Sequence, residues 1–138
     1  MKTIRSYLTF SGNCREAMHF YQQCLGGTLA FQAIADSPLA KGMPPHMQQW
    51  ILHATLTNGG TVLMGSDMVP DEGRIRGNAL AMMLDCNSRQ EAEQVFEALS
   101  GDGGTVLHPL ENTFWGALFG DLKDKYGNTW LIHFHENN

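Results

Sequence analysis

The sequence has few charged residues, few cysteines and no long apolar run. Charged side chains make up 17% of its 138 residues and hydrophobic ones 43%. No apolar stretch approaches the roughly 18 residues that a membrane-spanning helix needs. The nine Lys and Arg residues are scattered singly, whereas nucleic-acid-binding proteins gather them in a patch. We therefore expect neither a membrane protein nor a nucleic-acid partner.

Cysteine content and the N-terminal sequence indicate the cellular compartment in which the protein is expected. Three cysteines cannot all pair within one chain. The opening MKTIRSYLTF is interrupted by charges and lacks the apolar region of a signal peptide. We expect a cytoplasmic protein with reduced thiols. Its length allows one domain or two small halves that share a core.

Two segments, residues 13–29 and 88–106, repeat the same order of signals. Each begins with a small polar residue, continues with apolar residues at helical spacing, and ends in Gly-Gly-Thr. The spacing predicts two amphipathic helices, each ended by glycines that accept the left-handed conformation. Both starts read as capping boxes, with Asn13 three residues before Glu16 and Ser88 three residues before Glu91.

Alternating and β-branched stretches around these helices predict eight strands. The Asn-Gly-Gly at residues 58–60 predicts a hairpin turn, and segments 36–46 and 68–78, rich in Pro and Gly, read as mobile loops. The order is β-α-β-β-β, twice, with modules 1–67 and 78–138 and a linker at 68–77. The expected strands are residues 4–10, 28–35, 50–57, 61–66, 79–85, 105–108, 114–120 and 129–135.

Three sequence words resemble one family closely. They are YLTFSGNCREAMHFYQQCLGG at residues 7–27, LMGSD at 63–67, and FGDLKDKYGNTWLIHF at 119–134. Together with the doubled module they resemble the vicinal oxygen chelate superfamily, which includes glyoxalase, bleomycin resistance proteins and dioxygenases, and in particular its PhnB-like branch. Lys125 departs from the pattern, since the family usually has Pro there, and we expect it to alter a turn.

The resemblance implies an α+β fold in which the two modules form a curved mixed sheet around a cavity. Metal-dependent members place one His or Glu on each of four strands, and their cation activates a bound substrate. By the resemblance these positions fall on Arg5, Met64, Ala79 and Leu131. These four do not suit a divalent cation, which prefers carboxylate or imidazole. We therefore expect no metal and no other cofactor.

Strand alternation predicts which side chains face the cavity. The apolar face of the last strand places Leu131 and His133 on the other side, and His53 shares a face with Thr55. The two histidines would hold a displaced metal only with a third ligand. The alternative interpretation is that they form hydrogen bonds in the cavity or lie at its rim.

Four further side chains are candidates for ligand binding. Arg5 and Tyr7 lie on the polar face of the first strand, where a guanidinium suits a carboxylate or phosphate. Arg5 would equally pair with an internal acid. Trp50 and Trp115 begin strands and would stack on a planar ligand, or would serve as core or dimer-contact aromatics. Cys14, at a helix N-terminus, is in a position that favours the thiolate, but no base flanks it.

These features predict a protein that binds a small, partly apolar metabolite in its sheet cavity, and the resemblance implies a homodimer. The cavity candidates are Arg5, Tyr7, Trp50, His53, Met64, Trp115, Leu131 and His133. The alternative is a metal-dependent lyase or isomerase, or a resistance-type transferase, using His53, His133 and either Asp121 or Glu111 as ligands or as general acid and base. A structural or regulatory dimer with an incidental cavity is the third possibility.

Overall fold

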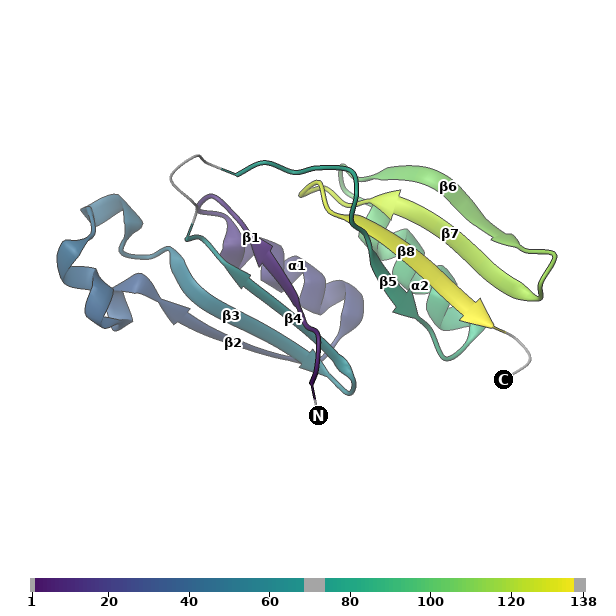
Figure 1. Cartoon of the computed structure of the whole chain (residues 1–138), viewed down its shortest axis with the longest axis horizontal. Coiled ribbons are helices and arrows are strands. Elements are labelled where there is room, and N and C mark those ends of the chain that lie inside the picture. The colour runs from purple at the N-terminus through teal and green to yellow at the C-terminus, as the bar shows by residue number, and fades with distance from the viewer. Residues whose placement is uncertain (1, 69–73, 136–138) are drawn as a thin grey trace. The chain divides into compact units, whose positions relative to one another are not determined.

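A computed structural model describes residues 2–68 and 74–135 as two compact units, Met1–Ile75 and Arg76–Asn138 (Figure 1). The boundary falls inside the predicted linker, of which residues 69–73 lie outside the described residues. Each unit is an α+β module with one four-stranded mixed sheet and one long helix. Within the described ranges, no helix is long and apolar enough to cross a membrane.

The first unit has strand order β1-β4-β3-β2. Strand β1 runs parallel to β4, and the other neighbours are antiparallel. Helix α1 packs on one face of this sheet through a fully buried stripe that includes Ala17, Met18 and Tyr21. The elements are β1 (Ser6–Thr9), α1 (Cys14–Leu25), β2 (Thr28–Ala33), β3 (Ile51–Asn58) and β4 (Thr61–Ser66).

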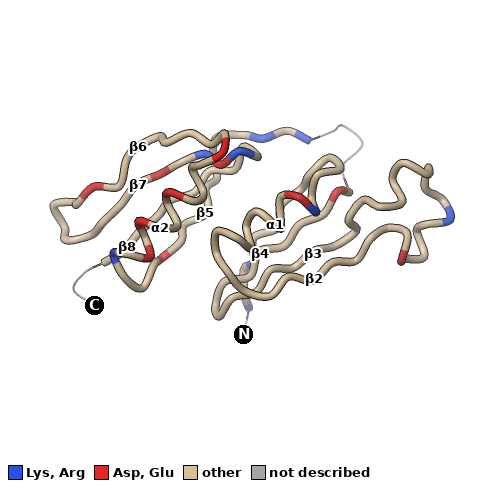
Figure 2. Tube along the Cα trace, turned by 180° about the vertical axis from the view of Figure 1, so that it is seen from behind, with Lys and Arg blue, Asp and Glu red and all other residues tan. Residues whose placement is uncertain are grey.

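The second unit repeats this topology in the order β5-β8-β7-β6, again with its first strand parallel to its last. Helix α2 packs on one face through Ala92, Phe96 and Leu99, and its outer side carries exposed glutamates (Figure 2). The elements are β5 (Met82–Asp85), α2 (Arg89–Ser100), β6 (Thr105–Asn112), β7 (Ala117–Lys123) and β8 (Thr129–His135). The doubled β-α-β-β-β order predicted from the sequence is confirmed.

The two helix starts differ from one another. At α2 the Ser88 hydroxyl accepts the Glu91 N–H at 3.0 Å, so the predicted cap at Ser88 is confirmed. The Glu91 carboxylate accepts the N–H of Asn87, one residue before the cap, at 2.8 Å. At α1 the Asn13 side chain makes no cap hydrogen bond. The Cys14 N–H donates instead to Asp67, which directly follows β4. The capping box predicted at Asn13 is therefore wrong, because a carboxylate from a distant strand satisfies this helix end.

Several strand limits also differ from the predicted ones. Strand β1 is limited to four residues, and Ile4 is 98% exposed outside it. Strand β6 continues past Pro109 to Asn112, and β7 begins only at Ala117. Segment 36–46, predicted as a loop, is largely folded into short 3₁₀ helices, Ile34–Asp36, Pro38–Gly42 and Pro45–Met47. The Gln48 side chain holds these turns by donating to the carbonyls of Ala40 and Met43.

Two β-bulges shape strand β6. Val106 pairs with Leu122 and His108 with Asp121, so Leu107 is an extra residue. A second bulge lies between His108 and Glu111. A bulge changes which face the next side chain occupies, and the first one turns His108 to the face that Asp121 occupies.

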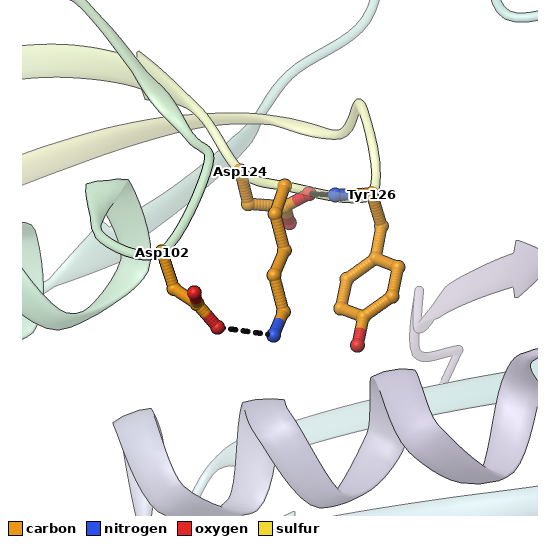
Figure 3. A network of polar contacts seen from close by, with 4 residues as sticks. Asp102, Asp124 and Tyr126 are labelled. Carbon is orange, nitrogen blue, oxygen red and sulfur yellow. Dashed lines mark hydrogen bonds and ion pairs between the residues drawn. The ribbon is translucent and has the colours of Figure 1, made fainter.

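The turn that contains Lys125 is held by Asp124 (Figure 3). Asp124 Oδ1 accepts the N–H groups of Tyr126 and Asn128 at 2.8 and 3.1 Å, and Oδ2 accepts the indole N–H of Trp130 at 2.8 Å. Lys125 instead donates to Asp102 Oδ2 at 2.8 Å. The hydrogen bonds that form the turn come from Asp124, so they do not depend on the side chain at position 125.

Candidate functional site

Each sheet has one face packed on its own helix and a second face, here called the open face, turned away from that helix. In β3 the helix-side residues Ala54 and Leu56 are buried, whereas His53 and Thr55 are half-buried. In β8 the same alternation separates buried Trp130 and Ile132 from half-buried Leu131 and His133. Because successive strand residues point to opposite faces, the candidate side chains on these strands lie on open faces.

The open face of the first unit brings three predicted residues together. Met64 in β4 is the register partner of Tyr7 on one side and of Thr55 on the other. The rings of Tyr7 and His53 lie with centroids 6.3 Å apart, and His53 Nε2 is 3.1 Å from Thr55 Oγ1. Tyr7, His53 and Met64 therefore form one patch of mixed polar and apolar character.

The other two candidates of the first unit lie elsewhere. Arg5 is exposed and precedes β1. Trp50 precedes β3, so it does not begin a strand, and its ring meets that of His46 edge-on with centroids 6.0 Å apart. A Cβ added at Gly12 would lie 3.1 Å from the Trp50 ring, which places this indole against the loop before α1.

The open face of the second unit carries Leu131 and His133. His133 Nδ1 lies 2.8 Å from Asp85 Oδ1, and Asp85 is its register partner in β5. Phe119 is its partner in β7, and the two rings meet at 72° with centroids 6.3 Å apart. One row across the sheet thus consists of an acid, an imidazole and an aromatic ring.

A neighbouring row on the same face contains a second pair of this kind. His108 Nδ1 lies 2.7 Å from Asp121 Oδ1, and Asp121 pairs with Leu131, which in turn pairs with Met83. The His108 side chain is 81% exposed, whereas that of His133 is 21% exposed. The two pairs therefore share their geometry and differ in their surroundings.

Trp115 lies in the turn between β6 and β7, not at the start of a strand. Its ring meets that of Phe114 at 90° with centroids 4.9 Å apart, and both side chains are exposed. The turn closes through Thr113, whose N–H and hydroxyl both donate to the Ala117 carbonyl. The tip of this hairpin is therefore an aromatic pair.

The four positions implied for metal ligands do not fit a metal ion. Arg5, Met64, Ala79 and Leu131 offer a guanidinium, a thioether, a methyl group and an isobutyl group, and none is a ligand for a hard or borderline cation. Across residues 2–68 and 74–135, no group of three or more His, Cys, Asp or Glu residues is placed to hold a metal. The four positions implied by the resemblance therefore do not suit the cation of the family's metal-dependent members.

The expectation that Cys14 favours the thiolate is wrong. Its side chain is fully buried. Burial, with a smaller contribution from the Asp67 charge, raises the pKa of the Cys14 thiol to about 12. Burial likewise raises the pKa of Cys86 to about 11. A thiol with a raised pKa is a poor nucleophile at neutral pH.

Sequence reasoning missed Asp85, Phe119 and His108 as members of the second open face. Alternation along β8 identifies the sheet face on which His133 lies. Which side chains lie beside His133 on that face depends on strand order and register. The parallel pairing of β5 with β8 joins residues 48 positions apart, and no local signal gives that register. The bulge that turns His108 likewise has no clear signal in the sequence.

The chain is similar to several known proteins. The sequence model of the Glyoxalase/Bleomycin resistance protein/Dioxygenase superfamily matches residues 3–132. Protein YjdN of Escherichia coli strain K12 is 31% identical over 139 residues, covering 94% of this chain and 93% of its own length.

Two solved structures are similar to this chain over nearly its whole length. The crystal structure of protein PA1353 from Pseudomonas aeruginosa shares 40% identity with a TM-score of 0.85, covering 98% of both chains. A PhnB protein from Bacillus cereus, described as a putative 3-demethylubiquinone-9 3-methyltransferase, shares 26% identity with a TM-score of 0.73, covering 96% of this chain and 99% of its own. The chain therefore belongs to the glyoxalase/bleomycin resistance protein/dioxygenase superfamily, and its PhnB-like resemblance has a structural counterpart.

Proposed function

We propose that this protein binds a small metabolite on the open faces of its sheets without a metal ion. The observation that carries the proposal is the composition of those faces. In each unit, the face turned away from the helix gathers a histidine, an aromatic ring and an aliphatic or thioether side chain on adjoining strands. Ligand sites typically combine an apolar surface with a few polar groups that fix orientation.

The chemistry of these faces favours a partly apolar ligand with at least one polar group. Met64 in the first unit, and Leu131 beside Phe119 in the second, supply apolar contact area. Tyr7 and the two histidines supply hydrogen-bonding groups at its margin. Arg5, exposed just before β1, suits an anionic substituent.

The experiment combines elemental analysis with thermal unfolding against a metabolite panel. We expect no stoichiometric metal in the purified protein. We also expect at least one ligand that raises the unfolding temperature, since a ligand that binds only the folded state stabilises it. The variant Met64→Arg should remove the shift for a ligand of the first open face, and Glu93→Gln, on the exposed side of α2, should retain it. One Zn, Ni, Mn or Fe per chain would overturn the metal-free proposal.

A homodimer is also part of the proposal. Large apolar side chains are exposed on both units, among them Ile4, Leu80 and Phe114, and burial of such side chains in a dimer would remove them from water. Sedimentation velocity over a range of protein concentrations tests this directly. A monomer at every concentration would contradict it.

The methyltransferase in the description of the Bacillus cereus protein is not part of this proposal. A nucleotide-type cofactor loop needs several glycines between the first strand and the first helix. Here the loop between β1 and α1 contains only Gly12.

A further inference from the structure

Asp85 and His133 have the geometry of a proton-transfer pair. A carboxylate only accepts hydrogen bonds, so the 2.8 Å contact between Asp85 Oδ1 and His133 Nδ1 requires the proton on Nδ1. In a neutral imidazole the lone pair then lies on Nε2. The acid thereby fixes both the tautomer and the orientation of the ring.

The imidazole of His133 lies among apolar side chains of the second open face. Its side chain is 21% exposed, and its ring and that of Phe119 meet in a T-shaped arrangement. Leu131 and Met83 pair in the adjacent row of the same face. The apolar side chains beside the imidazole offer contact area to a planar ligand.

The charged and titratable groups that share this face come from every strand of the sheet. They are Asp85 in β5, His135 in β8, Asp121 and Lys123 in β7, and His108 and Glu111 in β6. His135 lies on the same side as His133 because residues two apart in a strand share a face. Asp85 is the member of this set that contacts the His133 imidazole, at 2.8 Å.

We propose that Asp85 and His133 form a dyad that accepts a proton from the acidic hydroxyl of a phenolic or enolic ligand lying against Phe119 and Leu131. The ligand O–H bond breaks, its electron pair stays on the oxygen, and a new N–H bond forms at His133 Nε2. The imidazolium formed is balanced by the Asp85 carboxylate, and no redox partner is needed. This inference rests on the proposed function, since it names the ligand class of the second open face.

The chain supplies a matched control in His108 and Asp121. That pair has the same Nδ1 contact, at 2.7 Å, but its imidazole is 81% exposed and therefore remains solvated. Changes at His108 or Asp121 should leave the chemistry of His133 unchanged. Because Asp85 is itself 75% exposed, its truncation leaves the core intact.

The first test is the tautomer of His133, read from the side-chain nitrogen shifts by NMR in the free protein. We expect the Nδ1–H form in the wild type and loss of that preference in Asp85→Ala. Asp121→Ala should change the His108 signals alone. An Nε2–H tautomer at His133 in the wild type would overturn the proposal, and this result does not depend on any ligand.

The second test uses 4-nitrophenol as the probe at slightly acidic pH, where absorption reports its ionised fraction. We expect binding to increase the phenolate band. We expect His133→Gln to lower the phenolate-to-phenol ratio of the bound probe by about tenfold, which corresponds to one unit in its pKa. His108→Gln should retain the wild-type ratio. Absence of binding, or binding without ionisation, overturns the dyad proposal. The proposal that the protein binds a metabolite is tested by a different result. It is overturned if no compound of the metabolite panel raises the unfolding temperature.

Discussion

Asp67 Oδ1 accepts a hydrogen bond from the backbone N–H of Cys14 at 3.0 Å. The same oxygen accepts the Gly12 N–H, and Oδ2 accepts the Ile51 N–H, both at 2.8 Å. One carboxylate, 1% exposed, therefore joins the start of α1, the loop before it and the first residue of β3. A buried carboxylate is tolerated in a fold when hydrogen bonds replace its lost hydration, and here three N–H groups do so.

Asp67→Ala is expected to be strongly destabilising. It leaves the buried N–H groups of Cys14 and Ile51 without this acceptor, at about 1–3 kcal/mol each. Chemical denaturation should show a loss of about 2–6 kcal/mol. Asn13→Ala is the control, because its side chain makes no cap hydrogen bond. A larger loss in Asn13→Ala than in Asp67→Ala would refute this assignment of the cap.

The raised pKa of Cys14 predicts alkaline destabilisation. An unfolded thiol ionises near pH 9.0, whereas burial keeps the folded thiol protonated until about pH 12. The neutral thiol therefore contributes its full stability below about pH 9 and loses it as pH rises toward about 12. The expected slope is on the order of 1 kcal/mol per pH unit.

Urea unfolding across this pH range measures the effect. Cys14→Ala should flatten the dependence, and the half-buried Cys24→Ala serves as the control. The pH dependence that remains in Cys14→Ala should include a contribution from Cys86, because its pKa is also raised, to about 11. An unchanged slope in Cys14→Ala would contradict the prediction.

The ion pair between Lys125 and Asp102 predicts a change in the pKa of Asp102 when Lys125 is replaced. The hydrogen bond from Lys125 lowers the pKa of the Asp102 carboxyl, and the lysine charge adds to the shift. The pair therefore stabilises the fold above the ordinary carboxyl range and loses this contribution as pH falls through the lowered pKa. Lys125→Ala should raise the pKa of Asp102 toward its ordinary value, followed by NMR of the carboxyl carbon.

Because Asp102 is 82% exposed, solvent screens the pair, and the unfolding midpoint should stay nearly constant in Lys125→Ala. Lys123→Ala is the matched control, since Lys123 ends β7 and makes no contact with Asp102 among the described contacts. An Asp102 pKa that stays low in Lys125→Ala would assign the shift to another cause.

The doubled module was readable from the sequence because helix periodicity, glycine stops and strand alternation are local signals. The face of His133 and that of His53 follow from alternation alone. The cap of α1 and the partner of His133 do not, since Asp67 and Asp85 reach them across long separations in sequence. These contacts are set by strand order and register, which depend on packing of the whole unit.

Gly120 connects the fold of the second unit to its open face. A Cβ added there would lie 2.9 Å from the Leu110 nitrogen and 3.0 Å from the His108 carbonyl oxygen. These are backbone atoms of the bulged strand β6, so Gly120→Ala must displace that strand. We expect a loss of about 1–3 kcal/mol from overpacking, measured by denaturation. The contact between His108 and Asp121 should break while that between His133 and Asp85 persists, seen in the imidazole nitrogen shifts. Gly60→Ala, with open space around its Cβ position, should be neutral. If Gly120→Ala retained the His108 signals, the bulge would not be what turns this side chain toward Asp121.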